Sequence, residues 1–248
     1  MKSAIAIQWI AHRGFGAIAP ENTLAAIRQA IVLGADGIEF DIQRSQDGAL
    51  VVFHDVTLAR TTNGQGRLSD HSLKYLKTLD AGGWFGSEFA GEAIPALTEV
   101  LALCAEQEIR LYPEIKATQG WTEAQIRELV TIFDTAQWRD RITICAFDGA
   151  FLAQVRALAP RLAVAYGVST VEQYGQAWVQ VQAATGRVAL SIADDLLAAH
   201  PDWLAAAQVQ QVPVLVWTVN NPVRQRELAA LGVAGVITDI PLDLRAIE

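Results

Sequence analysis

The sequence predicts a single α/β domain folded as a (β/α)8 barrel, also called a TIM barrel. Three observations support this fold class. The chain has 248 residues, close to the roughly 250 that one such barrel uses. Short apolar segments rich in Val and Ile alternate with segments of helical period, as in a parallel sheet covered by helices. About eight such units follow one another, which favours closure into a barrel over an open sheet.

Nine segments are candidate strands, and one pair of them departs from the alternation. Residues 46–48, Gln-Asp-Gly, join the second and third segments without room for a helix. Asp-Gly between apolar runs favours a tight turn, so we expect this pair to be antiparallel, and one strand need not belong to the barrel wall. The candidates are residues 5–11, 37–42, 49–54, 110–115, 141–147, 161–168, 188–192, 212–219 and 233–238.

Several helices between these strands have recognisable ends. Asn and Thr are frequent caps at helix starts, Pro fits the first turn, and Gly often ends a helix. Apolar residues repeat at helical spacing after each expected start. The predicted ends are Asn22 and Gly34 for the first helix, starts at Thr98 and Thr122 for two others, and Asn221-Pro222 with Gly232 for the last.

Residues 55–95 interrupt the alternation. They contain the glycine-rich runs 61–66 and 82–86 and a short helical piece at 73–79, but no clear strand. A long irregular insert in a compact domain is usually functional. We therefore predict a small subdomain that covers the barrel mouth, inserted after the strand ending at His54, within one domain that spans residues 1–248.

Composition limits the partners and the compartment. The formal charge is −8 and no basic stripe is present, which argues against nucleic acid as a partner but permits a small anionic substrate. Neither a signal sequence nor a run of 18 apolar residues is found, so we expect a cytoplasmic protein without stable membrane association. Cys104 and Cys145 are expected to be small buried thiols. The oligomeric state stays open, because exposed apolar surface is not readable from sequence.

Three carboxylates stand at the ends of predicted strands. Glu39 and Asp41 are two residues apart, so both point to one side of their strand, and Glu114 ends another strand. Buried acids that converge repel one another unless a cation holds them, and oxygen-only ligation suits one divalent cation, Mg²⁺ or Ca²⁺. The alternative is a structural ion network with the cations Arg13, Arg44 and Lys116.

Two of the four histidines also end neighbouring strand candidates. His12 and His54 are placed to face one another across a pocket. Imidazole titrates near neutral pH, so such a pair can supply the acid and the base of a phosphoryl transfer. His71, in the insert, and His200, before Pro201, are expected to be surface or structural residues.

Other polar and aromatic residues near the strand ends are candidates for substrate binding. The Arg13 guanidinium suits a phosphate, the neighbouring Gly14 permits close backbone approach, and Lys116 shares a strand face with Glu114. Each cation has a structural alternative, which is ion pairing with the acids. The remaining candidates are Trp217 as a pocket wall or a packing residue, Glu21 and Asn22 in supporting roles or Asn22 as a helix cap, and Asp239 as a cap.

With these motifs in place, the chain resembles the glycerophosphodiester phosphodiesterase family, in its bacterial cytoplasmic form. The resemblance runs from about residue 10 to 241, and a small departure is Tyr112-Pro113 before Glu114. It rests on the order and spacing of His12-Arg13-Gly14, Pro20-Glu21-Asn22-Thr23, Glu39-Phe40-Asp41, His54-Asp55, Arg60-Thr61-Thr62-Asn63-Gly64, Glu114-Ile115-Lys116 and Trp217-Thr218-Val219-Asn220.

The resemblance implies a barrel like that of phosphoinositide-specific phospholipase C. It also implies a divalent cation on Glu39, Asp41 and Glu114, and acid–base roles for His12 and His54. The implied substrates are small glycerophosphodiesters such as glycerophosphocholine and glycerophosphoethanolamine, hydrolysed to an alcohol and sn-glycerol 3-phosphate. By analogy with the related phospholipases, His12 is the base and His54 the acid, and the nucleophile is water or the glycerol hydroxyl.

Other functions fit the sequence less well. A lysophospholipase D-type phosphodiesterase, or one acting on phosphosphingolipids, would use the same barrel, but the sequence shows no basic amphipathic helix or exposed aromatic hook. A non-catalytic phosphate-ester binding protein would not need every catalytic position filled. A metal-dependent aldolase or sugar-phosphate isomerase would not need the paired histidines.

Overall fold

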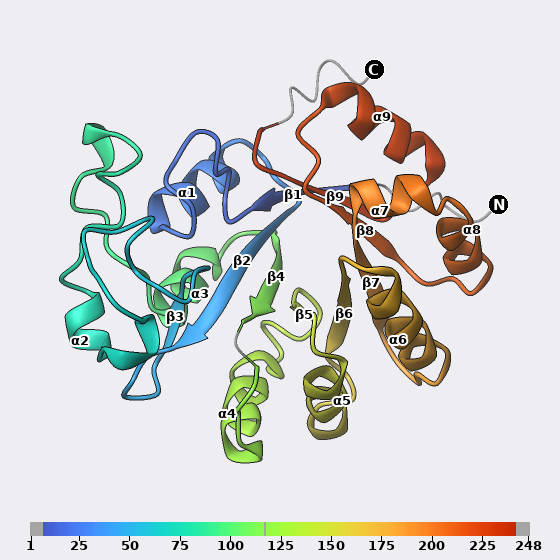
Figure 1. Cartoon of the computed structure of the whole chain (residues 1–248), viewed down its shortest axis with the longest axis horizontal. Coiled ribbons are helices and arrows are strands. Elements are labelled where there is room, and N and C mark those ends of the chain that lie inside the picture. Colours follow the sequence, from blue (N-terminus) through green and yellow to red (C-terminus); the bar gives the residue numbers. More distant parts are fainter. Residues whose placement is uncertain (1–6, 117, 242–248) are drawn as a thin grey trace. The chain divides into compact units, whose positions relative to one another are not determined.

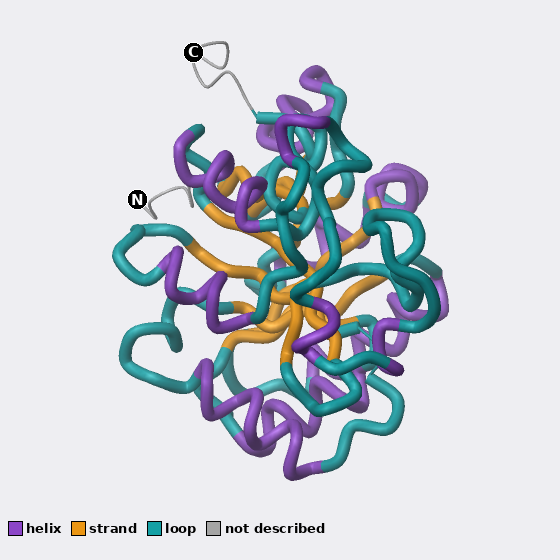
Figure 2. Tube along the Cα trace, turned by 90° about the vertical axis from the view of Figure 1, so that its left-hand side faces the viewer, coloured by secondary structure: helices purple, strands orange, loops and turns teal. Residues whose placement is uncertain are grey.

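The computed structural model describes residues 7–116 and 118–241. Strands and helices alternate along most of this trace (Figures 1 and 2). The strands are β1 (Gln8–His12), β2 (Gly37–Arg44), β3 (Leu50–Val52), β4 (Arg110–Ile115), β5 (Thr143–Ala146), β6 (Ala163–Val168), β7 (Val188–Ala193), β8 (Val214–Trp217) and β9 (Gly235–Thr238).

The strands form one sheet that closes on itself. Neighbours are hydrogen-bonded in the order β1-β9-β8-β7-β6-β5-β4-β2-β3, and an additional β1–β2 pairing closes the ring. β3 pairs antiparallel with β2, with Ile42 opposite Val52, as the Asp-Gly turn predicts. The (β/α)8 barrel and the hairpin are therefore confirmed. Residues 5 and 6 of the first expected strand lie outside the described residues, and β1 begins at Gln8.

Contacts within the chain divide it into two units. Unit 1 contains Thr118–Thr238 and the described residues before Ala11. Unit 2 contains the described part of Ala11–Ala117, together with Asp239–Pro241. The assignment of residues 1–248 to a single domain stays a prediction.

Unit 1 is a run of parallel strands, β5 to β9, connected by helices. β6 pairs in register with β7, Tyr166 opposite Leu190, and β7 pairs with β8, Ala193 opposite Trp217. Such strands are apolar throughout because helices cover them, and every residue of β6 is buried. The helices are α4 (Glu123–Phe133), α5 (Gly149–Leu158), α6 (Val171–Gln182), α7 (Asp194–Ala199), α8 (Asp202–Val209) and α9 (Pro222–Leu231).

Unit 2 joins β2, β3 and β4 to the inserted segment. Its helices are α1 (Leu24–Val32), α2 (Leu73–Leu76) and α3 (Leu97–Cys104), with short 3-10 turns at Leu68–Asp70 and Ser87–Phe89. β2 and β4 are parallel neighbours whose register places Asp41 opposite Glu114. This register brings two of the predicted metal ligands side by side.

The helix ends confirm some predicted caps and correct others. Thr122 caps α4, Asn221 with Pro222 begins α9, and Gly232 ends α9 with φ of 80°. Asn22 is not the cap of α1: the Thr23 hydroxyl accepts the hydrogen bond from the Ala26 amide, which leaves the Asn22 side chain for another role. α3 begins at Leu97, one residue before the predicted start at Thr98.

The inserted residues 55–95 have a small apolar core of their own. No regular strand occurs among them, as predicted, and only an isolated bridge joins Thr57 to Arg67. The core also includes two residues from the preceding strand region, so it ties the insert to β3. Its buried members are Val51, Phe53, Leu58, Leu68, Leu76, Leu79, Ala81 and Ile94.

Across residues 7–116 and 118–241, the helices are all too short or too polar to cross a lipid bilayer.

Candidate active site

Unit 2 brings the three predicted metal ligands together. Glu39, Asp41 and Glu114 each offer a carboxylate oxygen, and these oxygens lie within 4.8 Å of one another. Glu39 and Asp41 are only 4% and 1% exposed. Two-residue spacing on β2 and the β2–β4 register produce this convergence, as the sequence predicts. Clustered, buried oxygen ligands suit a hard divalent cation.

Two oxygens of this cluster are incompletely satisfied by the protein. Asp41 Oδ1 and Glu114 Oε1 are buried and accept no hydrogen bond. Lys116 Nζ lies 3.1 Å from Asp41 Oδ1 and also forms an ion pair with Glu114, so one ammonium group is the charge partner of both carboxylates. Buried carboxylate oxygens left in this way are what a coordinated cation would satisfy, so the donor set fits the metal that the sequence predicts.

The acids affect one another's protonation. Burial, with the charges of Asp41 and Glu114, raises the pKa of Glu39 to about 8. Burial and Asp41 also raise the pKa of Glu114. Burial works against ionisation of Asp41 as well, but Lys116 and Arg13 outweigh it and lower its pKa. The three carboxyl groups therefore outnumber the two cationic side chains, Lys116 and Arg13, that neutralise them.

His12 is held by a carboxylate that sequence reasoning assigned elsewhere. Its Nδ1 lies 2.6 Å from Asp239 Oδ1, and its Nε2 lies 3.9 Å from Glu39 Oε2. Burial opposes protonation of the ring, but Asp239 and Glu39 outweigh it and raise the pKa of His12. Asp239 is thus a ring partner, where the sequence suggested only a cap. The pairing joins positions 227 apart, and no local pattern reveals it.

His54 has a similar partner but a different electrostatic balance. Its Nδ1 lies 2.6 Å from Oδ1 of the adjacent Asp55. Burial lowers the pKa of His54, and the charges of Arg13 and Lys116 add to this effect. Asp41 and Asp55 act in the opposite direction without restoring the ordinary value. In each predicted histidine, an aspartate oxygen therefore contacts Nδ1, and Nε2 lies on the opposite side of the ring from this contact.

Arg13 lies between several acids. Its amide donates to Glu39 Oε2, and its guanidinium donates to Glu21 and lies 3.2 Å from Asp41. Its φ of 55° is unusual for a residue with a side chain. Gly14 packs against helix α1: a Cβ there would lie 2.5 Å from Ala26 Cβ. The structure thus places Arg13 at the carboxylate cluster, in ion pairs of the kind that its structural alternative predicts, and gives Gly14 a packing role.

Asn22 supports the cluster directly. Its Nδ2 donates to Asp41 Oδ2 over 2.8 Å, and its Oδ1 accepts from the Asp41 amide. Asn tolerates a left-handed backbone better than most residues, and the φ of Asn22 is 59°. The supporting role considered for Asn22 matches this contact, and the capping role does not.

Arg60 connects residues that sequence reasoning treated separately. It donates to both oxygens of Asp55 and to both oxygens of Glu21. Glu21 in turn accepts from Arg13. In the sequence, Arg60 stood out only as the first residue of the motif Arg60-Thr61-Thr62-Asn63-Gly64. Its partners are 5 and 39 positions away, so the sequence pattern does not reveal these contacts.

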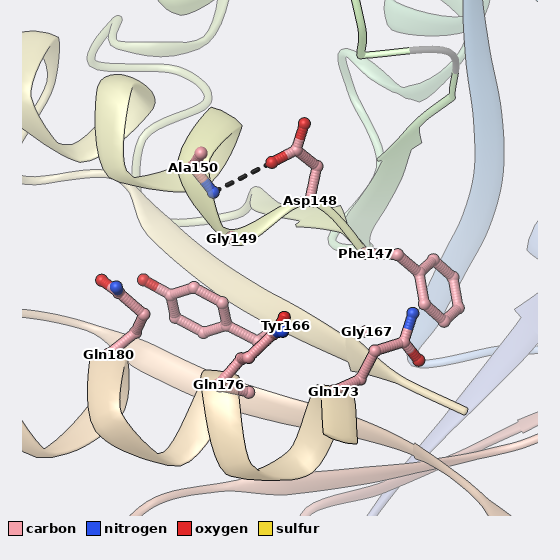
Figure 3. A pocket seen from close by; sticks show the side chains of 10 residues that line it. Phe147, Asp148, Gly149, Ala150, Tyr166, Gly167, Gln173, Gln176 and Gln180 are labelled. Carbon is pink, nitrogen blue, oxygen red and sulfur yellow. Dashed lines mark hydrogen bonds between the residues drawn. The ribbon is translucent and has the colours of Figure 1, made fainter. Parts of the chain in front are cut away.

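Trp217 ends β8 in unit 1, where its ring meets Phe147. The ring centroids are 5.6 Å apart and nearly perpendicular. Gly167 permits this arrangement, because a Cβ there would lie 2.9 Å from the Phe147 ring. Phe147 also lines a pocket of about 380 Å³ in which Gln173, Gln176 and Gln180 of α6 lie across from Tyr166 and Asp148 (Figure 3). None of the predicted site residues lines this pocket.

The residues expected to be structural have structural contacts. His71 contacts the Gln65 carbonyl and stacks on Tyr75, and His200 stacks on Trp203. Cys104 and Cys145 are buried and not bonded to one another.

The family model and the similar known proteins all point to one family. Residues 12–243 match the model described as the Glycerophosphoryl diester phosphodiesterase family. A glycerophosphodiester phosphodiesterase from Caldanaerobacter subterraneus subsp. tengcongensis is 36% identical over 94% of this chain and 93% of its own length. One from Bacillus subtilis is 31% identical over 94% of this chain and 83% of its own length.

Solved structures agree. A phosphodiesterase from Oleispira antarctica, in complex with the product sn-glycerol-3-phosphate, superposes with a TM-score of 0.86 at 30% identity, covering 97% of this chain and 96% of the other. A glycerophosphodiester phosphodiesterase from Agrobacterium tumefaciens gives a TM-score of 0.79 at 26% identity, with coverage of 95% and 97%.

Proposed function

Because this chain belongs to the glycerophosphoryl diester phosphodiesterase family, whose members are phosphoric diester hydrolases, we propose that it hydrolyses small glycerophosphodiesters with one divalent cation and two histidines. Glycerophosphocholine and glycerophosphoethanolamine are the proposed substrates, and sn-glycerol 3-phosphate and an alcohol are the products. The observation that carries the proposal is the pairing of two aspartate-held imidazoles with a buried acid cluster in unit 2.

Glu39, Asp41 and Glu114 are the proposed ligands of the cation, Mg²⁺ or Ca²⁺. When bound, it would polarise phosphate oxygens as a Lewis acid. Asn22 orients Asp41 through its two hydrogen bonds, the kind of support that tunes a ligand. Family members are generally dependent on a divalent metal, and the acid cluster supports the same requirement here.

The protein's own groups bind the phosphate and move the protons. Arg13 and Lys116 offset charge that develops on the phosphate oxygens in the transition state. His12 Nε2 takes the proton from the nucleophile, which is water or the glycerol hydroxyl, and His54 Nε2 donates one to the leaving alcohol. The order of the two histidines rests on the related phospholipases. Without a cation the pKa of His12 is raised and that of His54 is lowered, and a cation on Glu39 would oppose the rise for His12.

Trp217 is the proposed wall for the head group. It ends β8, and barrel enzymes place substrate contacts at the carboxyl ends of strands. Aromatic faces attract quaternary ammonium groups, so a Trp217→Ala variant should raise KM for glycerophosphocholine more than for glycerophosphoethanolamine. Equal KM values in wild type and variant would exclude Trp217 from the site.

The decisive assay uses EDTA-treated protein and glycerophosphocholine. Release of glycerol 3-phosphate, followed by a coupled enzyme, should appear only when Mg²⁺ or Ca²⁺ is restored. His12→Ala and His54→Ala should each lower kcat by at least roughly a hundredfold. Near-native turnover by either variant with metal present would rule out the two-histidine scheme.

A lysophospholipase D-type activity is the second candidate. Trp84 in the insert is 43% exposed, with Phe85 packed edge-on against it, and the sequence alone did not identify this exposed aromatic side chain. An exposed aromatic side chain is suited to an apolar chain or a membrane interface. Trp84→Ala should impair lysophosphatidylcholine hydrolysis, if that activity is present, and leave glycerophosphocholine hydrolysis unchanged. The cytoplasmic location stays a prediction.

A further inference from the structure

Arg60 makes an unusual set of contacts for a surface arginine. Its Nε and one terminal nitrogen donate to the two oxygens of Asp55, over 2.6 and 2.9 Å. Its two terminal nitrogens donate to the two oxygens of Glu21, over 2.8 and 2.7 Å. One planar guanidinium thus bonds two carboxylates in a forked geometry that lysine cannot reproduce.

Each of these carboxylates holds a proposed active-site group. Asp55 Oδ1 lies 2.6 Å from His54 Nδ1, and Glu21 accepts from the Arg13 guanidinium over 2.7 Å. Hydrogen bonding to Arg60 lowers the pKa of Asp55 to about 2, so Asp55 is an ionised acceptor. An ionised acceptor at Nδ1 requires the proton to be on Nδ1, which leaves Nε2 for the reaction.

The loop that carries Arg60 is well held. The Leu58 amide donates to the Gly66 carbonyl, which closes the loop at its base. The Thr62 hydroxyl donates to the Leu58 carbonyl and accepts from the Gly64 amide. Leu58 is fully buried in the apolar core of the insert. A rigid support of this kind keeps a side chain in one geometry.

From these contacts we infer that Arg60 is a positioning residue: it links the insert to His54 through Asp55 and to Arg13 through Glu21, and so holds both in working geometry. The inference rests on the proposed function, which gives His54 and Arg13 their roles. The insert would then contribute to the reaction through Arg60, by holding two active-site side chains in place. Arg60 itself is not proposed to touch the substrate.

The fold should tolerate the loss of Arg60. Its side chain is 45% exposed, and exposed ion pairs contribute little to stability. Arg67 offers a matched control, because it lies in the same insert, its side chain is exposed, and its contacts with Thr57 and Asp70 are made by its backbone. Arg60→Lys keeps the charge without the fork, and it carries the test if Arg60→Ala does not fold.

The test combines kinetics with nitrogen-15 NMR of the His54 ring, assigned with a His54→Asn variant. With glycerophosphocholine and saturating Mg²⁺, Arg60→Ala should lower kcat roughly ten- to a hundredfold and leave KM almost unchanged. The population of the Nδ1-protonated form of His54 should fall in the same variant. Arg60→Lys should recover only part of both losses, and Arg67→Ala should match wild type.

Arg60 is a positioning residue only if Arg60→Ala lowers both kcat and the Nδ1-protonated population of His54. Either effect without the other overturns the inference. A rise in KM alone, with an unchanged His54 spectrum, would mean that Arg60 contacts the substrate. Unchanged kcat would mean that the links do not matter to the reaction. Wild-type protein that releases no glycerol 3-phosphate would instead contradict the proposed function, and the His54 spectrum would still report whether Arg60 holds the ring.

Discussion

The two histidines of unit 2 share a partner type but differ in surroundings. Each has Nδ1 2.6 Å from an aspartate oxygen, yet the pKa of His12 is raised and that of His54 is lowered. Identical partners therefore do not decide which ring is the acid. The leaving group of the substrate offers a direct way to separate the two roles.

A substrate that releases p-nitrophenolate needs little help from a general acid. If His54 is the acid, His54→Ala should lose far less activity on glycerophospho-p-nitrophenol than on glycerophosphocholine, by about two orders of magnitude. His12→Ala should be impaired on both substrates. Paired kcat measurements check this, and the opposite pattern would exchange the two assignments.

Lys116 allows a second test at the residue scale. It is the cation beside Asp41 and Glu114, so Lys116→Met should destabilise the metal-free protein by about 3 kcal/mol, the cost of leaving buried acids without their partner. Added Mg²⁺ should restore most of that loss. Thermal unfolding with EDTA and with Mg²⁺ measures both values, and an equal loss in both conditions would count against a cation at this cluster.

Residue types predicted the cluster but not the contacts around it. Glu39 and Asp41 were recognisable because β-strand spacing is strictly periodic. Asn22 resembled a helix cap by type, yet Thr23 caps α1 and Asn22 bonds Asp41. Both are plausible caps in sequence, and only the path of the loop decides between them. Tertiary contacts of this kind leave no local signal.

At the scale of elements, Gly14 determines how α1 packs. Its φ is 74°, and a Cβ would lie 2.5 Å from Ala26 Cβ and 2.6 Å from the Ala26 backbone carbon. Gly14→Ala should cost at least about 3 kcal/mol, because strain and overpacking add. Gly34 is a matched control: it has the same φ and no atom within 4 Å.

Gly34→Ala should therefore cost only the backbone strain, roughly 1–2 kcal/mol. Urea unfolding of both variants measures the difference. Similar losses at the two positions would show that the contact with α1 is not what requires glycine at position 14.

Element boundaries were harder to predict than elements. The Asp-Gly turn gave the β2–β3 hairpin, and β3 proved to be only Leu50–Val52, shorter than the predicted segment 49–54. His54 therefore follows the strand instead of ending it. Strand ends depend on where hydrogen-bonded partners stop, and the partners of β3 are set by the course of the insert.

At the scale of the whole molecule, pH and metal should act together on stability. The pKa of Glu39 is raised from its ordinary 4.5 to about 8 in the metal-free fold. A raised pKa favours the folded state below 4.5, and this contribution is lost as pH rises to about 8. Cation binding needs ionised carboxylates and strengthens over the same range.

The melting temperature with Mg²⁺ minus that with EDTA should therefore grow between pH 4.5 and about 8. Differential scanning fluorimetry across this range checks it. The Glu39→Gln variant serves as control, because it should show a much flatter difference. A difference that stays constant in wild type would contradict the coupling, because either Glu39 does not titrate in this range or it does not bind the cation.

The barrel was predictable because its evidence is repeated along the chain. Each strand–helix unit adds to the same conclusion, so an error in one boundary does not change the fold class. The pairing of His12 with Asp239 has no such repetition. It depends on the sheet closing through β1–β2 and β1–β9, which places residues from opposite ends of the sequence together.

That pairing also bears on biosynthesis. A ribosome delivers His12 early and Asp239 227 positions later, so a growing chain carries the histidine long before its carboxylate partner leaves the exit tunnel. Nascent or prematurely terminated chains that lack Asp239 would have one unsupported imidazole. Phosphodiesterase activity should consequently appear only after the segment that contains Asp239 has been made.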